Sequence, residues 1–435
     1  MNAAVRGYTG RPTDCGGISM RMSSPTEPAD LDLACFSDVH GWGGALTAAQ
    51  GLSGAARRVG LTHRLLGVGR PDPSAAASQR VNVEVPVVPG LWRIRSWCVS
   101  RALARHLWRF QPPRRAFATL SPYWVVAARA AWPAARVVYV FPCLLSNCLP
   151  FTWPKRQPPT FWRRVDFAGT RRAEHLALSA ADLTLTPTEE SCAEILAFHP
   201  AARGTVEVCD YGCDAAELPA GVRATQRRAL GLPEDAVLFA VAGVCDLNKA
   251  FAWAVRELAA VGRRGRLLIV GDGPERAGLE RLAQELGVSG RVHLVGAQRD
   301  MTPWYAAADV VVSTSHYDTF PNVLLEGMWH GRPALVPRHD PPHVYAGMAG
   351  VIATESGGVL YDRRRFGALS DGMNRLLADP RRLAELGRKA QTCVRRRFRW
   401  DRCLARVVGL SEGTKGRSPG DHLDAVGEPE QVCVR

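Results

Sequence analysis

Residues 316–327 read His316-Tyr317-Asp318-Thr319-Phe320-Pro321-Asn322-Val323-Leu324-Leu325-Glu326-Gly327, which sets two carboxylates, with seven residues between them, around a strand-to-helix turn. An apolar strand is predicted just before, at 309–313, and Pro321 suits the first turn of the helix that follows. A helix start attracts phosphate, and the flanking carboxylates can accept hydrogen bonds from sugar hydroxyls. The stretch therefore indicates a nucleotide-sugar site. Capping and dipole compensation, worth about 0.3 to 1 kcal/mol per charge, are the alternative reason for acids at a helix start.

Strand and helix patterns alternate around this turn. In the second half, strands are predicted at 236–242, 266–270, 291–295, 309–313 and 334–336. The first half repeats the pattern more faintly, with strands predicted at 33–36, 62–67, 116–120, 137–141 and 183–187. Such alternation is typical of doubly wound parallel sheets. We therefore expect an α/β protein.

A lysine stands at the turn after the strand at 236–242. Of 55 basic residues only four are lysine, namely Lys155, Lys249, Lys389 and Lys415. Because arginine is the default cation of this chain, Lys249 is predicted to neutralise a diphosphate as a point charge; a solvated surface lysine is the alternative. The next turn carries Gly271-Asp272-Gly273, where glycines either let the backbone approach a ligand or satisfy a tight turn.

Taken in order, these blocks resemble a known family. Gly243 followed by Lys249, Gly271-Asp272-Gly273-Pro274-Glu275, a strand ending at Gly296 and the acid-x7-Glu block are similar to the C-terminal domain of GT-B glycosyltransferases. The likeness is strongest to the retaining glycosyltransferase family 4, also called glycosyl transferases group 1, and covers roughly 237–410. It implies a GT-B fold, with two Rossmann-like doubly wound domains facing a central cleft and a C-terminal helix crossing back to the first domain.

The resemblance also implies roles for individual residues. Glu326 would hold the ribose hydroxyls, Asp318 would face the donor sugar and Lys249 would bind the diphosphate, and these three are the candidate catalytic residues. The nucleobase would lie against the backbone after the strand at 291–295, and the distal phosphate would lie at the start of the helix after Pro321. A glycine loop at 41–44 would approach both the phosphate and the acceptor. The candidate donor-binding residues are Gly43, Gly44, Lys249, Gly296, Ala297, Gln298, Asn322, Val323 and Glu326.

The implied activity is that of a hexosyltransferase-class enzyme. It would move a sugar from a nucleoside-diphosphate sugar, with UDP or GDP favoured, to a hydroxyl acceptor such as a cell-envelope glycolipid or a secondary metabolite such as an antibiotic. Retention of configuration is implied by the family resemblance only. Chemistry without a metal or cofactor is expected, because Lys249 and the helix start could stabilise the charge on the leaving diphosphate. Another GT-B enzyme, such as an epimerase or a phosphorylase, and a non-catalytic nucleotide-sugar-binding protein remain alternatives.

The sequence departs from the family pattern in three places. Val244 stands where the family usually carries an arginine, and Asp318 replaces the usual glutamate. Losing a charged hydrogen bond to phosphate costs about 1.5 to 3 kcal/mol, so the loop at 338–343, which carries Arg338, is a candidate replacement. The family's histidine after the fourth strand is also missing, since Phe141-Pro142-Cys143 occupies that place, and Asp38 and His40 are weak substitutes.

Length and composition suggest how the chain is organised. Its 435 residues suit two domains of about 180 residues each plus tails. We expect a disordered leader at 1–30, an N-terminal acceptor domain at 31–220, a nucleotide-sugar domain at 221–398, a crossover helix at 399–410 and a disordered tail at 411–435. The 12 cysteines contain no Cys-x-x-Cys pair, so no structural metal is expected.

Charge and hydropathy bear on location and partners. No apolar run of about 18 residues and no leader pattern are evident, so a cytoplasmic location is expected. The formal net charge is +14, and Arg101, Arg105 and Arg109 are predicted to share one helical face beside Leu103 and Leu107. A basic amphipathic helix of this kind could lie on the inner, anionic face of a membrane, although a solvated arginine-rich face is the alternative. Nucleic-acid binding is not expected, because the aromatic residues do not form a stacking platform. The richness in arginine and alanine is typical of a bacterium with high GC content.

Overall fold

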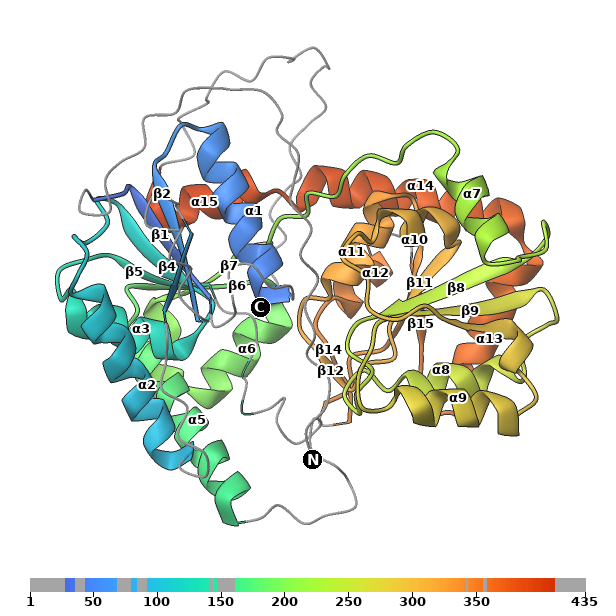
Figure 1. Ribbon diagram of the computed structural model, residues 1–435, viewed down its shortest axis with the longest axis horizontal. Coiled ribbons are helices and arrows are strands. Elements are labelled where there is room, and N and C mark those ends of the chain that lie inside the picture. Colours follow the sequence, from blue (N-terminus) through green and yellow to red (C-terminus); the bar gives the residue numbers. More distant parts are fainter. Residues whose placement is uncertain are drawn as a thin grey trace, which may run out of the picture.

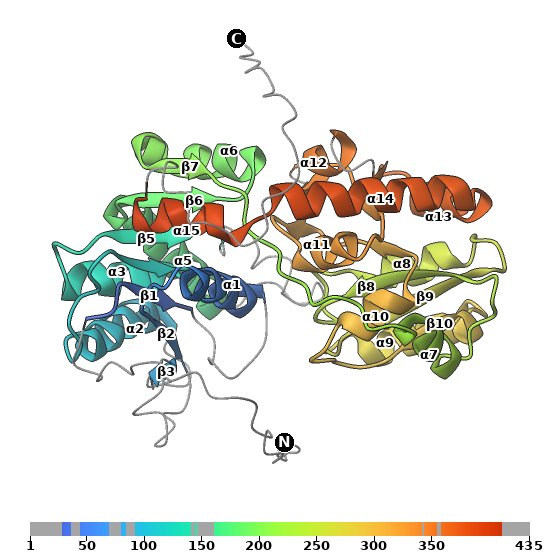
Figure 2. The same cartoon turned by 90° about the horizontal axis from the view of Figure 1, so that it is seen from above.

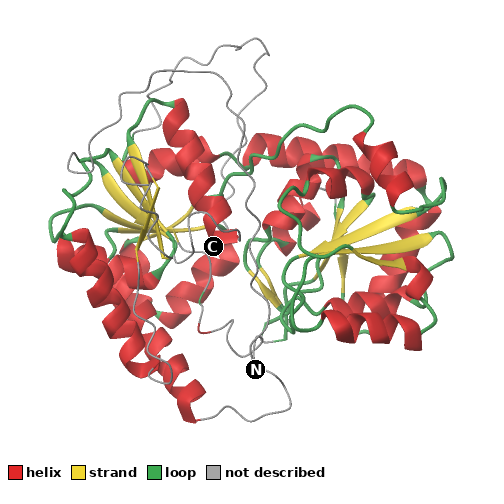
Figure 3. Cartoon of the chain, viewed as in Figure 1, coloured by secondary structure: helices red, strands yellow, loops and turns green. Residues whose placement is uncertain are grey.

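The computed structural model describes residues 28–35, 44–68, 80–83, 92–140, 144, 146, 161–341, 343–354 and 358–410. These residues form two α/β lobes that lie side by side (Figures 1 and 2). Each lobe has a parallel sheet between helices, as the yellow strands and red helices of Figure 3 show. The predicted pair of doubly wound domains is therefore confirmed.

The N-terminal lobe is built on a seven-stranded sheet in the order β3-β2-β1-β4-β5-β6-β7. Its strands are β1 (Leu31–Ala34), β2 (His63–Val68), β3 (Arg80–Val83), β4 (Ala116–Thr119), β5 (Val137–Val140), β6 (Leu183–Thr186) and β7 (Val206–Val208). Its helices are α1 (Gly44–Arg58), α2 (Trp92–Leu107), α3 (Pro122–Ala131), α5 (Phe161–Ala180) and α6 (Glu189–Phe198), followed by the 3-10 turn η2 (Pro200–Gly204). Successive residues of one strand face opposite sides, so Val138 packs under α1 while Val137 and Tyr139 pack against α2, α3 and α5.

The C-terminal lobe repeats this plan with a six-stranded sheet in the order β10-β9-β8-β11-β13-β15. Its strands are β8 (Val237–Ala242), β9 (Gly265–Val270), β10 (Val292–Leu294), β11 (Val310–Val312), β13 (Ala334–Pro337) and β15 (Val359–Tyr361), with a separate pair, β12 (Tyr317–Asp318) and β14 (Tyr345–Ala346). Its helical elements are α7 (Val222–Ala229), α8 (Phe251–Leu258), α9 (Arg276–Glu285), η3 (Ser289–Arg291), α10 (Thr302–Ala307), α11 (Asn322–Trp329), α12 (Ala349–Thr354), α13 (Ala368–Ala378) and α14 (Pro380–Arg397). The winding direction reverses between β8 and β11, and ligands of open α/β sheets bind at such a switch point.

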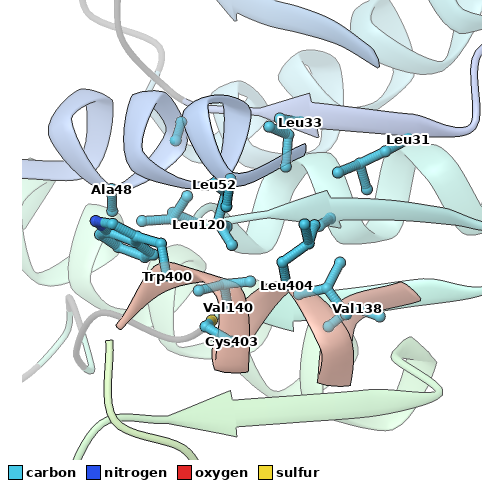
Figure 4. Close-up of a cluster of buried hydrophobic side chains, with 14 of the residues drawn as sticks. Leu31, Leu33, Ala48, Leu52, Leu120, Val138, Val140, Trp400, Cys403 and Leu404 are labelled. Atoms are coloured by element: carbon cyan, nitrogen blue, oxygen red, sulfur yellow. The ribbon is translucent and has the colours of Figure 1, made fainter. Parts of the chain in front are cut away.

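A C-terminal helix crosses back to the first lobe, as predicted. Helix α15 (Trp400–Val408) packs beneath α1, with Trp400, Cys403 and Leu404 among the leucines of the N-terminal core (Figure 4). The Trp400 ring fills space that side chains would otherwise occupy, because a Cβ on Gly51 or Gly212 would lie 2.2 Å from it. Helix α15 therefore belongs to the core of the N-terminal lobe, although it follows the C-terminal lobe in the sequence.

Two chain segments connect the lobes and are tied together. The N–H of Cys213 donates to the carbonyl of Phe398 at 3.0 Å. The Arg397 guanidinium donates to both carboxylate oxygens of Asp210, at 2.7 and 2.9 Å. Two-pronged pairs of this kind fix geometry as well as charge, so the connection has a defined shape.

Two local predictions are wrong. Pro321 caps α11 in an extended conformation, with φ −75° and ψ 98°, instead of lying within its first turn. Arg109 lies in a turn beyond the end of α2 and does not continue the helical face of Arg101 and Arg105. Leu103 and Leu107 are fully buried in the core, so the apolar side of α2 faces the protein.

Some predictions fall outside the described residues. These are the disordered ends at 1–27 and 411–435, and the residues Asp38, His40, Gly43, Phe141, Pro142 and Cys143. Across the ranges that the structure describes, every helix is too short or too polar to cross a membrane.

Candidate active site

The loops that follow β8 and β11 meet at the switch point of the C-terminal sheet. Lys249 lies between β8 and α8, and Asp318 ends the short strand β12. The Lys249 Nζ lies 2.6 Å from Asp318 Oδ2, and the two side chains are 26% and 16% exposed. Ser315 Oγ donates to the same carboxylate oxygen at 3.3 Å. The structure thus brings together the predicted diphosphate cation and the predicted sugar-facing acid, and pairs them with each other.

Asn248 fastens these two loops to each other. Its side-chain oxygen accepts from the N–H of Tyr317, and its amide group donates to the carbonyl of Tyr317, both at 3.0 Å. The hydroxyl of Thr314 donates to the carbonyl of Lys249 at 2.7 Å, and the N–H of Lys249 donates to Asp246 at 2.8 Å. Sequence reasoning missed Asn248. The one signal for it was its position next to Lys249, together with a side-chain amide that can both donate and accept hydrogen bonds.

Glu326 is held by a residue that sequence reasoning also missed. The Tyr305 hydroxyl, from α10, donates to Glu326 Oε2 at 2.7 Å. Burial raises the pKa of Glu326, and the hydrogen bond from Tyr305 opposes that rise. Burial also raises the pKa of Tyr305 well above its ordinary value, helped by the charge of Glu326. Tyr305 therefore keeps its proton and remains a donor that fixes the orientation of the carboxylate.

Small-molecule sites usually measure about 300 to 1,000 Å³, and the cavity that contains Asp318 and Glu326 measures 720 Å³. Helix α1 of the N-terminal lobe contributes Thr47 to its wall. Seven predicted residues line it, namely Lys249, Ala297, Gln298, Asp318, Asn322, Val323 and Glu326. Gly296 is not among the lining residues, but its carbonyl accepts the N–H of Gly271, which is, at 2.8 Å. Gly44 is the first residue of α1, and Gly43 lies outside the described residues.

The glycines of the turn after β9 serve close packing between loops. Gly271 has φ +151°, and a Cβ there would lie 1.8 Å from the carbonyl oxygen of Gly243. Gly273 has φ +156°, and its Cβ would lie 2.6 Å from the carbonyl oxygen of Cys245. The loops after β8 and β9 can therefore lie against each other only because these positions lack side chains.

The departure at position 244 is visible in the cavity. Val244 is 56% exposed and lines the wall. The described residues of 338–343 are absent from that wall; His339 Nδ1 instead accepts the N–H of Ala346 at 3.2 Å, and Asp340 pairs with Arg364 at 3.3 Å. Arg299, next to the predicted nucleobase segment, supplies a further cation to the wall.

His330 forms the floor beside Tyr305. The two rings are stacked with their centroids 5.8 Å apart. Burial, followed by the charge of nearby Arg332, lowers the pKa of His330 to about 4. The imidazole is therefore neutral at physiological pH and contributes an uncharged, flat surface to the cavity.

Comparison with solved structures defines the class of fold. The chain superposes on WaaG, a glycosyltransferase involved in lipopolysaccharide biosynthesis, with a TM-score of 0.68 and 17% identity over 87% of this chain and 100% of the other. It superposes equally on Anabaena Alr3699/HepE in complex with UDP and glucose, with a TM-score of 0.68 and 16% identity over 88% and 100% of the two chains. The chain thus has the GT-B fold that the sequence predicted.

Sequence comparison identifies the domain that carries the site. Residues 235–379 match the family described as Glycosyl transferases group 1. A D-inositol 3-phosphate glycosyltransferase of Xylanimonas cellulosilytica is 30% identical over 257 residues, which are 56% of this chain and 60% of the relative. The lipopolysaccharide core biosynthesis glycosyltransferase LpsE of Rhizobium meliloti is 37% identical over 121 residues, 28% of this chain and 35% of the relative. The chain therefore spans less than two thirds of the length of either relative.

Proposed function

We propose that the protein is a glycosyltransferase that moves a sugar from a nucleoside-diphosphate sugar to a hydroxyl group of an acceptor. The observation that carries this proposal is the convergence of Lys249, Asp318 and Glu326 on one 720 Å³ cavity at the start of α11. The family match at 235–379 covers these three residues. Relatives and structural neighbours that carry the name glycosyltransferase support the same activity.

The site's charges suit a diphosphate. Lys249, the N-terminal end of α11 and Arg299 all favour an anion in this cavity. Before a donor binds, Lys249 is paired with Asp318, and a diphosphate oxygen would offer the ammonium a second anionic partner. Asp318 could then accept hydrogen bonds from hydroxyls of the donor sugar.

The opposite end of the cavity suits a ribose. Glu326 presents a carboxylate whose Oε2 is fixed by Tyr305, so the group is oriented before the ligand arrives. A carboxylate that accepts two neighbouring hydroxyls would bind the cis-diol of a ribose. We propose UDP as the nucleotide, because the structural neighbour from Anabaena is seen with UDP and with UDP-glucose.

The transfer step would depend on positioned electrostatics. As the sugar leaves, negative charge grows on the diphosphate, and Lys249 together with the dipole of α11 would stabilise that charge. We propose retention of configuration without a metal, as the family resemblance implies. The acceptor would approach from the N-terminal lobe and, by analogy with the relatives' names, would be a phosphorylated polyol or a glycolipid sugar.

A screen of donors followed by product analysis tests the proposal. We expect the melting temperature of the full chain to rise with one of UDP-, GDP-, ADP- or TDP-sugars, and slow release of free sugar and nucleoside diphosphate from that donor. Appearance of an epimerised donor would instead indicate an epimerase. Binding without turnover, with or without polyol and glycolipid acceptors, would indicate a non-catalytic binder. This alternative is motivated by Val244, which stands where the family usually carries an arginine.

A further inference from the structure

Helix α6 of the N-terminal lobe faces the strand pair β12 and β14 of the C-terminal lobe (Figure 1). The Tyr317 hydroxyl donates to the Glu194 carboxylate, 2.8 Å from one oxygen and 3.0 Å from the other. The Tyr345 hydroxyl lies 3.3 Å from Ser191 Oγ. Side chains of one lobe are thus hydrogen-bonded to side chains of the other, at a place remote from the covalent connections.

Local structure on both sides makes this contact rigid. The Thr188 side chain accepts the N–H of Ser191 and caps α6. Across the interface, Tyr317 and Tyr345 are paired in register between β12 and β14. Their rings are stacked with centroids 4.6 Å apart, and they are 4% and 8% exposed. Two buried phenols therefore present their hydroxyls to α6 as a single unit.

The same strand leads directly into the candidate active site. Asp318 follows Tyr317, and alternation along a strand points their side chains to opposite faces. The Tyr317 peptide is held on both sides by Asn248, the neighbour of Lys249. Asp318 is paired with Lys249. Adjacent residues of strand β12 therefore carry the contact between the lobes, at Tyr317, and the ion pair in the cavity, at Asp318.

We propose that Glu194 is a positioning residue that acts through Tyr317 on the Lys249–Asp318 pair. When Glu194 accepts the Tyr317 hydroxyl, the N-terminal lobe is held over the cavity and strand β12 is fixed in place. The hydrogen bond between Tyr317 and Glu194 then couples the approach of the lobes to the geometry of the donor site. The expected effect on turnover rests on the proposed function. The expected effect on strand β12 rests on the contact between the lobes alone.

The experiment compares Tyr317→Phe and Glu194→Ala with wild type in the full chain. We expect kcat for donor hydrolysis to fall about tenfold or more, as for loss of a hydrogen bond to a charged group, because Asp318 is no longer held in place. The dissociation constant for UDP should stay within about twofold, since this nucleotide lacks the sugar that Asp318 faces. Glu194→Gln keeps an oxygen that accepts from the phenol and should recover most of the lost kcat. Tyr123→Phe, which removes a hydroxyl 3.5 Å from Thr170 Oγ1 within the N-terminal lobe, is the matched control.

Hydrogen exchange of the amides at 316–318, measured without any donor, gives a readout that needs no activity. Exchange should quicken in Tyr317→Phe and Glu194→Ala and remain at the wild-type rate in Tyr123→Phe. Unchanged exchange in the first two variants would overturn the proposal. So would an equal loss of UDP affinity and kcat together with a lower melting temperature, which indicates a merely structural role. A wild-type protein that turns over no donor would refute the proposed function, while the exchange result would still decide the role of Glu194.

Discussion

At the residue scale, Asp318 and Glu326 are each held by another side chain before a ligand binds. Lys249 and Ser315 hold Asp318, and Tyr305 holds Glu326. Side chains that are already ordered lose less conformational entropy on binding, which favours affinity. The cavity is therefore preorganised for its ligand by hydrogen bonds among its own residues.

His330 provides a test at this scale. The pKa of its ring is lowered to about 4 in the folded protein and is about 6.5 in an unfolded chain. Between these values the unfolded state binds one proton more, so the free energy of unfolding should fall as the pH is lowered, by up to about 1.4 kcal/mol per pH unit. His330→Gln should flatten this dependence in urea unfolding at pH 7, 6 and 5. His343→Gln, at an exposed position, should retain the wild-type slope; an unchanged slope in His330→Gln would contradict this account.

At the element scale, the site is made by three loops that leave the sheet at neighbouring strands. The loops after β8 and β9 interlock at Gly243 and Gly271, and the segment after β11 is fastened to the first of them by Asn248. The cavity's shape therefore depends on how closely backbones approach one another. A single side chain in the wrong place should separate the loops.

Gly271→Ala tests this dependence. Its Cβ would lie 1.8 Å from the Gly243 carbonyl, at φ +151°, so we expect a loss of about 1 to 3 kcal/mol in the free energy of unfolding and weaker nucleotide binding. Gly278→Ala is the matched control, because a Cβ there meets nothing within 4 Å. In helix α9 it should be neutral or stabilising by about 0.5 to 1 kcal/mol. Equal stability of the two variants in urea would show that the loops tolerate a side chain.

The elements that could be predicted are those whose pattern is contained in one short stretch of the sequence. Strands such as β8 and β9 are continuous apolar runs because both faces of the parallel sheet are covered, and the spacing of Asp318 and Glu326 is visible in one stretch of chain. The pair β12 and β14 escaped prediction because strands of two residues show no periodicity. Asn248 and Tyr305 escaped because their partners are distant in sequence. Pro321 was misplaced by one position, the usual uncertainty of helix boundaries.

At the scale of the whole molecule, several contacts between described residues join the two lobes. The two connecting segments are tied together by Asp210 and Arg397. Helix α15 packs into the core of the N-terminal lobe, and the Tyr317 hydroxyl donates to Glu194 of that lobe. The proposed donor cavity belongs mainly to the C-terminal lobe and takes Thr47 from the other. Donor and acceptor would thus be presented by different lobes, so their alignment would depend on how the lobes are held together.

The central claim is that this cavity binds a nucleoside-diphosphate sugar through Lys249, and calorimetric titration of the full chain with UDP and UDP-sugars tests it most directly. We predict measurable binding by wild type and affinity about 10- to 100-fold weaker in Lys249→Met, as expected for loss of a charged hydrogen bond. Lys389→Met removes a lysine that is likewise paired, with Glu385 at 2.9 Å on the surface of α14, and should bind like wild type. If Lys249→Met binds as tightly as wild type, or if wild type binds no nucleoside diphosphate, the claim is contradicted.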